Sequence, residues 1–358
     1  MNNIFNLLVT SLLMGVFLQS CPSEPSSKTI ITADTPVIDT ASDTPKMAGL
    51  SFVACPRPYS TAVMQEAKTV NATWISVIPY AFSRVTEPSV RYNGFGKQWW
   101  GESYEGVKTT IDSAHKASIH VLLKPQVYVG DGWTGSLDYK TEENWVKWET
   151  DYEKYLMPFV EIAVEKHVEA ICIGTEFKMM TTPRETFWRN LIVKIRKKYN
   201  GKLTYAANWD DYAIIPFWDA LDFVGIDAYM PLLEIDTPSV SALCEAWKPY
   251  FKDIKNFHLK VKKPICFTEF GYMSVDGCAG KTWVVEQKRK DNMLKINELA
   301  QANALDALFT TFWKESWWLG GFLWKWFPNG QGHEGYIERD YTPQKKQAAA
   351  VVAKWYKK

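Results

Sequence analysis

Two short stretches, AICIGTEF at residues 170–177 and PICFTEF at residues 264–270, decide how the chain is expected to fold. Each is a continuous apolar run bounded by polar residues and by Gly or Pro, which is typical of a buried parallel strand. Each also ends with a glutamate, Glu176 or Glu269, directly after a threonine. A carboxylate at such a place is costly to bury and adds nothing to packing. Two of them on two similar strands indicate a pair of acids that face one cleft.

Strand-like and helix-like segments alternate on both sides of these two stretches. The predicted strands are residues 49–54, 73–79, 119–124, 170–176, 203–207, 223–227, 264–269 and 321–326. Regular alternation favours an α/β protein with a parallel sheet, and eight such units in a chain of 358 residues fit a (β/α)8 barrel, the TIM barrel. An open doubly wound sheet is the alternative, although no GxGxxG sequence follows the first predicted strand.

Polar or aromatic side chains stand at the ends of most of these strands. They are Lys124, Gln126, Glu176, Asn208, Asp210, Tyr229, Glu269 and Trp324. The functional groups of a (β/α)8 barrel lie at the carboxyl ends of its strands. This repeated placement predicts one site at one rim of the barrel, with the two glutamates in it.

The connecting segments are predicted to be helices or loops. Residues 80–101 and 127–143 are expected to be long loops, and residues 282–303 one long helix. Residues 182–185, Thr-Pro-Arg-Glu, have the sequence of a capping box with proline at the first helical position, which predicts a helix start. The depth of any cleft at the rim depends on the long loops.

The composition indicates a globular protein with a sizeable core. Hydrophobic residues make up 46% of the chain, and the formal net charge of +1 gives no indication of a nucleic acid partner. No CxxC sequence or His/Cys cluster indicates a metal site. The 17 tryptophans are unusual, because aromatic faces stack on sugar rings as well as fill cores, and both uses stay open.

The N-terminal segment is predicted to direct export. Residues 4–18 form an apolar run of signal-peptide length, and Leu18-Gln19-Ser20-Cys21 resembles the lipobox of bacterial lipoproteins. Residues 2–6 contain no Lys or Arg, so a plain cleaved signal is the alternative. We expect residues 1–20 to be a lipoprotein-type signal peptide and Cys21 to be lipidated. The protein would then be anchored in the bacterial cell envelope, on its periplasmic or cell-surface side.

The segment after Cys21 is expected to be a tether. Residues 21–46 are rich in Pro, Ser and Thr and lack periodic apolar positions, which is typical of a flexible linker. Residues 47–358 are predicted to form one barrel domain, and the protein is expected to be a monomer.

The remaining cysteines are expected to be mostly structural. Cys172 and Cys266 lie inside the two apolar strands, where a cysteine acts as a small buried hydrophobic residue. A disulfide between Cys244 and Cys278 would be compatible with export, and the sequence leaves it open.

The chain resembles glycoside hydrolase family 113 in five places. They are GTEF at 174–177, YAANWD at 205–210, DFVGIDAYMPL at 222–232, PICFTEFGY at 264–272 and GFLWKW at 321–326. The family belongs to the retaining β-glycosidases of clan A, whose acids close strands four and seven of a (β/α)8 barrel, and its known activities are β-1,4-mannanases. The resemblance covers most of residues 47–327. It implies an enzyme that needs no cofactor and acts on mannan-type polysaccharides or oligosaccharides by double displacement.

The resemblance also implies roles for single residues. Glu176 would be the acid/base and Glu269 the nucleophile. Tyr229 matches the clan's tyrosine that hydrogen-bonds the nucleophile. Trp324 matches the aromatic residue that stacks beneath the sugar at the cleavage point.

Further substrate contacts are expected at four positions. Lys124 and Asn208 lie where the family contacts sugar hydroxyl groups, and either could be structural instead. Trp133 and Trp326 are candidate sugar platforms, with loop anchoring as the alternative for Trp133 and core packing for Trp326. Many clan members have Asn directly before the acid/base, where this chain has Thr175. The contact with the sugar 2-hydroxyl would then come from another residue such as Asn208.

Two other functions stay open. One is another β-glycanase or β-glycosidase of the same clan, acting on glucan, xylan or a mixed glycan. The other is a non-catalytic, glycan-binding lipoprotein that uses the barrel and its aromatic groove, which the presence of both acids disfavours.

Overall fold

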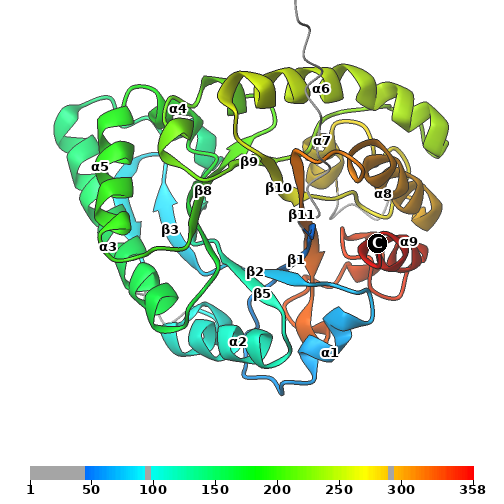
Figure 1. Ribbon diagram of the computed structural model, residues 1–358, viewed down its shortest axis with the longest axis horizontal. Coiled ribbons are helices and arrows are strands. Elements are labelled where there is room, and N and C mark those ends of the chain that lie inside the picture. The colour runs from blue at the N-terminus through cyan, green and yellow to red at the C-terminus, as the bar shows by residue number, and fades with distance from the viewer. Residues whose placement is uncertain (1–44, 93–97, 289–293) are drawn as a thin grey trace, which may run out of the picture. The chain divides into compact units, whose positions relative to one another are not determined.

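Eight parallel strands close into a barrel that helices surround (Figure 1). The structure, a computed structural model, describes residues 45–92, 98–288 and 294–358. The strand order around the barrel is β1, β11, β10, β9, β8, β7, β5, β2. The strands are β1 (Met47–Phe52), β2 (Trp74–Val77), β5 (His120–Leu123), β7 (Ala170–Thr175), β8 (Lys202–Asn208), β9 (Val224–Asp227), β10 (Ile265–Phe270) and β11 (Trp318–Trp326). The predicted (β/α)8 barrel is confirmed, and every predicted strand is present.

The helices lie outside the strands. They are α1 (Val63–Lys68), α2 (Tyr104–Lys116), α3 (Glu142–Glu165), α4 (Lys178–Thr181), α5 (Glu185–Arg196), α6 (Val240–Val261), α7 (Thr282–Gln287), α8 (Glu298–Phe312) and α9 (Gln347–Tyr356). Two details of the helix predictions are wrong. Residues 282–303 are not one helix, because the Asn297 side chain accepts the N–H of Ala300 and caps a new helix, α8. The helix predicted to begin at residues 182–185 is present, but its capping box does not form, because residues 182–184 make the turn after α4 and α5 begins at Glu185 with no side-chain cap.

Side chains of the barrel strands alternate between the barrel interior and the helices. In β7, Ala170 and Cys172 belong to a small buried cluster that also contains Cys266 of β10. Ile171 and Ile173 belong instead to the large core that includes the helices. Both faces of the strand are therefore buried, which explains the continuous apolar run in the sequence. Cys172 and Cys266 are fully buried, as expected.

The strand register shifts just before each of the two glutamates. β7 has one more residue than β8 between the pairs Cys172–Thr204 and Thr175–Ala206. β10 likewise has one more residue than β9 between Cys266 and Glu269. An inserted residue re-aims the side chains that follow it. These two irregularities, and not simple alternation, set the direction of the strand ends that carry the acids.

A second sheet stands where the sequence predicted long loops. It has three strands in the order β4 (Glu87–Arg91), β3 (Tyr80–Arg84), β6 (Gln126–Val129). β3 follows barrel strand β2 and β6 follows the neighbouring β5, and the two pair in parallel with Tyr80 opposite Gln126. The loop prediction was wrong here because strands of four or five residues are too short to show a clear alternation. The small sheet extends the barrel at the rim that carries the site.

Several predictions concern other parts of the chain. The signal peptide, Cys21 and the tether up to residue 44 lie outside the described residues. Within residues 45–92, 98–288 and 294–358, no helix has the length and apolarity needed to cross a bilayer. The cysteines there are all free thiols, so the disulfide between Cys244 and Cys278 does not form.

Candidate active site

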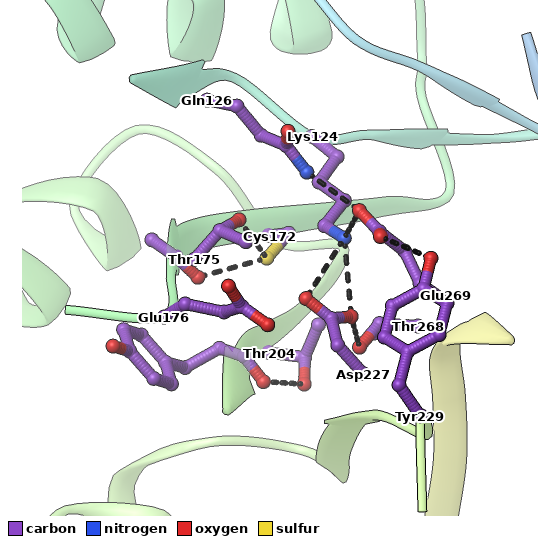
Figure 2. A network of polar contacts seen from close by, with 12 residues as sticks. Lys124, Gln126, Cys172, Thr175, Glu176, Thr204, Asp227, Tyr229, Thr268 and Glu269 are labelled. Atoms are coloured by element: carbon purple, nitrogen blue, oxygen red, sulfur yellow. Dashed lines mark hydrogen bonds and ion pairs between the residues drawn. The ribbon is translucent and has the colours of Figure 1, made fainter. Parts of the chain in front are cut away.

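Glu176 and Glu269 line one cavity at the carboxyl ends of the barrel strands. Glu176 directly follows β7 and Glu269 is the second-last residue of β10, so strands β8 and β9 separate them around the barrel. The cavity has a volume of about 550 Å³, and we call it the central cavity. Figure 2 shows both carboxyl groups directed toward the same space. The structure thus brings the predicted pair together.

Three donors hold the carboxylate of Glu269. The Lys124 ammonium lies 2.6 Å and the Gln126 side-chain amide 2.8 Å from Oε1, and the Tyr229 hydroxyl donates to Oε2 at 2.8 Å (Figure 2). Burial raises the pKa of Tyr229, and the charge of Glu269 raises it further, so the tyrosine keeps the proton that it donates. The hydrogen bond predicted for Tyr229 is therefore present. The three donors fix the orientation of the carboxylate.

Lys124 is buried between two carboxylates and does not line the central cavity. Its side chain is 0% exposed, and its ammonium group lies 3.2 Å from Asp227 Oδ1 as well as 2.6 Å from Glu269. Burial alone would lower the pKa of Lys124, but the charges of Asp227 and Glu269 outweigh burial and raise it. The predicted contact with sugar hydroxyl groups is corrected: the groups in contact with this ammonium are the two carboxylates.

Asp227, at the end of β9, is the second partner of this ammonium. The Thr268 hydroxyl donates to its Oδ1 at 2.8 Å. Burial and the charge of Glu269 raise the pKa of Asp227 well above its usual range, and Lys124 opposes the rise. One buried cation therefore joins the ends of three barrel strands.

Glu176 has a different environment from Glu269. The indole N–H of Trp133 donates to its Oε2 at 2.9 Å, and no cation lies within ion-pair distance among the described residues. Burial and the charge of Glu269 raise the pKa of Glu176 to about 7, and the hydrogen bond from Trp133 counteracts the rise. Glu176 is thus pushed toward its protonated form, as a proton donor requires, whereas Glu269 is held by three hydrogen-bond donors.

The backbone at Glu176 is in an unusual conformation. Its φ angle is +55°, in the left-handed region that non-glycine residues rarely adopt. The N–H of Glu176 donates to the carbonyl of Ala206 at 2.8 Å, and the N–H of Phe177 donates to the Tyr205 hydroxyl at 2.7 Å. These bonds to β8 hold the strained residue in place. Strain of this kind clusters at functional sites, where the surrounding structure has to maintain it.

The other predicted contacts divide into two groups. Trp133, Asn208 and Trp324 line the central cavity, and the Asn208 amide donates to Asp210 at 3.0 Å. Trp326 is only 3% exposed and belongs to the large core. Regular alternation would place both tryptophans on one face of β11. β11 has one more residue than β1 between the pairs Leu50–Leu323 and Phe52–Trp326, and this irregularity separates Trp324 from Trp326. The prediction of a sugar contact at Trp326 is therefore corrected.

The sequence analysis missed an aromatic pair in the wall of the cavity. Trp209 and Trp283 stack with ring centroids 6.0 Å apart and an interplanar angle of 11°. Trp283 is 42% exposed, and both rings line the central cavity. Trp209 comes directly after the β8 strand end, a signal that could have identified it, whereas Trp283 on α7 carries no such signal.

Among the described residues no set of three or more His, Cys, Asp or Glu side chains is arranged to hold an ion.

The chain matches the family model for Glycoside Hydrolase Family 113 over residues 56–346. Among solved structures, the GH113 β-mannanase AaManA from Alicyclobacillus acidocaldarius has a TM-score of 0.74 at 23% identity, covering 89% of this chain and 99% of that chain. A GH113 β-1,4-mannanase complex has a TM-score of 0.74 at 22% identity, covering 87% of this chain and 99% of that chain. A search of curated proteins found no match.

More distant structures share the barrel. The β-glucuronidase of Ruminococcus gnavus has a TM-score of 0.58 at 13% identity, covering 87% of this chain and 50% of that chain. At identities this low, the structural likenesses show the fold, and the family match rests on the sequence.

Replacing Trp133 with phenylalanine should raise the pKa of Glu176. The variant keeps an aromatic ring but loses the N–H that stabilises the charged carboxylate. The protonated form of Glu176 is therefore favoured more than in the unmodified protein. Carbon-13 NMR of the glutamate carboxyl groups over a pH titration measures the change. Trp283→Phe, in the same cavity but with no hydrogen bond to Glu176, is the matched control. An unchanged Glu176 titration in Trp133→Phe would contradict this account.

Replacing Lys124 with methionine should destabilise the fold strongly. The variant leaves Asp227 and Glu269 buried without their cation, and breaking a buried pair in this way costs about 3–5 kcal/mol. Urea unfolding of the variant measures the loss. Lys198→Met removes an exposed pair with Glu161 and should cost no more than about 1 kcal/mol. Equal losses in the two variants would argue against the buried charge cluster.

Proposed function

Because this chain belongs to Glycoside Hydrolase Family 113, we propose that it cleaves β-1,4-mannosidic bonds in mannan-type polysaccharides or oligosaccharides, with retention at the anomeric carbon. Family membership makes the chain a glycoside hydrolase. The observation that supports the roles of the two acids is the contrast between their surroundings in the cavity. Glu269 is held by a cation and two further donors, whereas the pKa of Glu176 is raised to about 7.

The first step of the proposed reaction forms a covalent intermediate. Glu269 attacks the anomeric carbon, and a bond from its carboxylate oxygen to the sugar replaces the glycosidic bond. Glu176 gives its proton to the departing glycosidic oxygen. A pKa near 7 suits this task, since the group still carries a proton near neutral pH and can release it.

The second step frees the enzyme. Glu176, now a carboxylate, takes a proton from a water molecule, whose oxygen attacks the anomeric carbon. The bond to Glu269 breaks, and the sugar leaves with its original anomeric configuration. Lys124, Gln126 and Tyr229 again stabilise the charge that returns to Glu269. These three are positioning residues in the proposal.

The wall of the central cavity supports a sugar substrate. Trp133, Trp324 and the stacked pair Trp209–Trp283 offer aromatic faces, and Asn208 offers an amide to a hydroxyl group. Thr175 stands before Glu176, so we assign the contact with the sugar 2-hydroxyl to Asn208. The choice of mannan is supported by the GH113 structures described as β-mannanases.

The proposed N-terminal anchor is separate from the chemistry. We propose that residues 1–20 are removed as a signal peptide, that Cys21 receives the lipid, and that residues 21–46 tether the barrel to the cell envelope. The support is the sequence Leu18-Gln19-Ser20-Cys21 after an apolar run, followed by the Pro/Ser/Thr-rich segment.

The catalytic pair can be tested with single variants on mannan. Glu176→Ala and Glu269→Ala should each lower the turnover number by at least about a hundredfold, since each removes a group that takes part in bond breaking. Glu161→Ala, an exposed glutamate on α3, should retain full activity. Azide should restore turnover to Glu269→Ala with formation of a glycosyl azide. Activity like that of the unmodified protein in either catalytic variant would exclude the assignment.

The substrate is tested with the same protein on mannan, glucomannan, cellulose and xylan. The proposal expects products from mannan and glucomannan. If the protein cleaves cellulose or xylan and not mannan, the assigned substrate is wrong and the proposed mechanism still applies. Activity on none of the four would favour a binding role.

The anchor is tested by fractionating cells that express the full chain. Cys21→Ser should move the protein from the membrane fraction to the soluble fraction, because the acyl chains would be absent. Unchanged membrane association in this variant would contradict lipidation at Cys21.

A further inference from the structure

Three cavities form a row across the rim of the barrel. Trp324 and Glu286 line both the central cavity and a second cavity of about 560 Å³, which we call the middle cavity. Phe82 and Tyr128 line both the middle cavity and a third of about 290 Å³, the distal cavity. Neighbouring members of the row share their walls, so the hollow that contains Glu176 and Glu269 continues well beyond these two residues.

The distal cavity belongs to the unexpected three-stranded sheet. Its lining comes from β3, β4 and β6 and the residue that follows β6. Tyr128 is 57% exposed although both of its neighbours in β6 are buried. Its ring meets Phe82 edge-on, with centroids 6.2 Å apart. A large aromatic ring held on a rigid strand and left open to solvent contributes little to the core and is suited to stacking against a ligand.

The charge of the lining changes along the row. Among the described residues, the central cavity is lined by four carboxyl side chains and no cationic one. The described lining of the distal cavity contains Arg84 and Arg91 and no carboxyl group. Arg84 is exposed, and Arg91 is paired with Glu87 outside the lining. Guanidinium groups donate several hydrogen bonds in a fixed geometry, which suits the hydroxyl groups of a sugar.

We infer that the distal cavity is an additional sugar-binding subsite, filled by a distant residue of the same polysaccharide chain that is cut between Glu176 and Glu269. The inference rests on the proposed function and adds the length of chain that the enzyme recognises. Tyr128 and Phe82 supply the aromatic contact, and Arg84 supplies donors to hydroxyl groups. The three cavities share lining residues, so a polysaccharide that lies in the central cavity and passes Trp324 reaches Tyr128 through the middle cavity. This is why we assign the distal cavity to the same polysaccharide chain.

The test compares long and short substrates. Tyr128→Ala should lower kcat/KM on the preferred polysaccharide roughly three- to tenfold, the value of one aromatic contact, and leave kcat/KM on the corresponding trisaccharide within about twofold. Tyr128→Phe should behave like the unmodified protein on both substrates, because it keeps the ring. Leu259→Ala, an exposed position on α6, is the control for loss of a surface side chain and should change neither value.

Two outcomes would overturn the inference. One is an equal loss of kcat/KM for Tyr128→Ala on the polysaccharide and on the trisaccharide, which would indicate a general structural effect. The other is an unchanged kcat/KM on the polymer.

A binding measurement separates this inference from the proposed function. If the unmodified protein cuts none of the four polysaccharides, the proposed function fails, and electrophoresis in gels that contain each polysaccharide tests the distal cavity. Binding to the polysaccharide slows migration, so Tyr128→Ala should be slowed less than the unmodified protein. Tyr128→Phe should be slowed as much as the unmodified protein. The same mobility for Tyr128→Ala and the unmodified protein in all four gels would overturn the subsite.

Discussion

The ammonium group of Lys124 is the interaction on which the site depends. It is fully buried and lies between Asp227 and Glu269, so it joins the end of β5 to the ends of β9 and β10. Two buried carboxylates so close together would repel each other strongly, and an intervening cation makes the arrangement possible. The same charges reach Glu176, whose pKa rises through burial and through Glu269. The two cavity acids thus differ in their contact with one lysine, which pairs with Glu269 and lies outside the lining of the central cavity.

Backbone irregularities place these charges where they meet. In each acid-bearing strand one extra residue breaks the register before the glutamate, and Glu176 itself has a positive φ. A regular strand would continue the alternation between interior and helices. The inserted residues and the left-handed turn re-aim the strand ends toward the cavity at some cost in backbone energy. The bonds from Glu176 to β8 and from Phe177 to Tyr205 hold this geometry.

The small sheet extends the rim beyond the central cavity. β3 and β6 follow β2 and β5 in the chain and carry Phe82 and Tyr128 into the lining of the distal cavity, away from Glu176 and Glu269. Gln126, the first residue of β6, reaches back to Glu269, so one short strand contributes at one end to the acid pair and at the other end to the distal cavity. The geometry of the acids and the length of the groove are therefore linked through the same strand.

The sequence by itself determined the barrel, its eight strands and the pair of acids at two strand ends, because buried strands and strand-end residues leave local patterns in the chain. The resemblance to family 113 added the hydrogen bond from Tyr229 to Glu269, which is present. Only the tertiary structure decided the partners of Lys124, the hydrogen bond from Trp133 to Glu176, the burial of Trp326 and the small sheet. Lys124 and Asp227 are 103 residues apart, and Trp133 and Glu176 are 43 apart. A local pattern predicts that a side chain stands at a strand end, whereas its charge partners and its exposure depend on which distant strand ends the closed barrel brings against it.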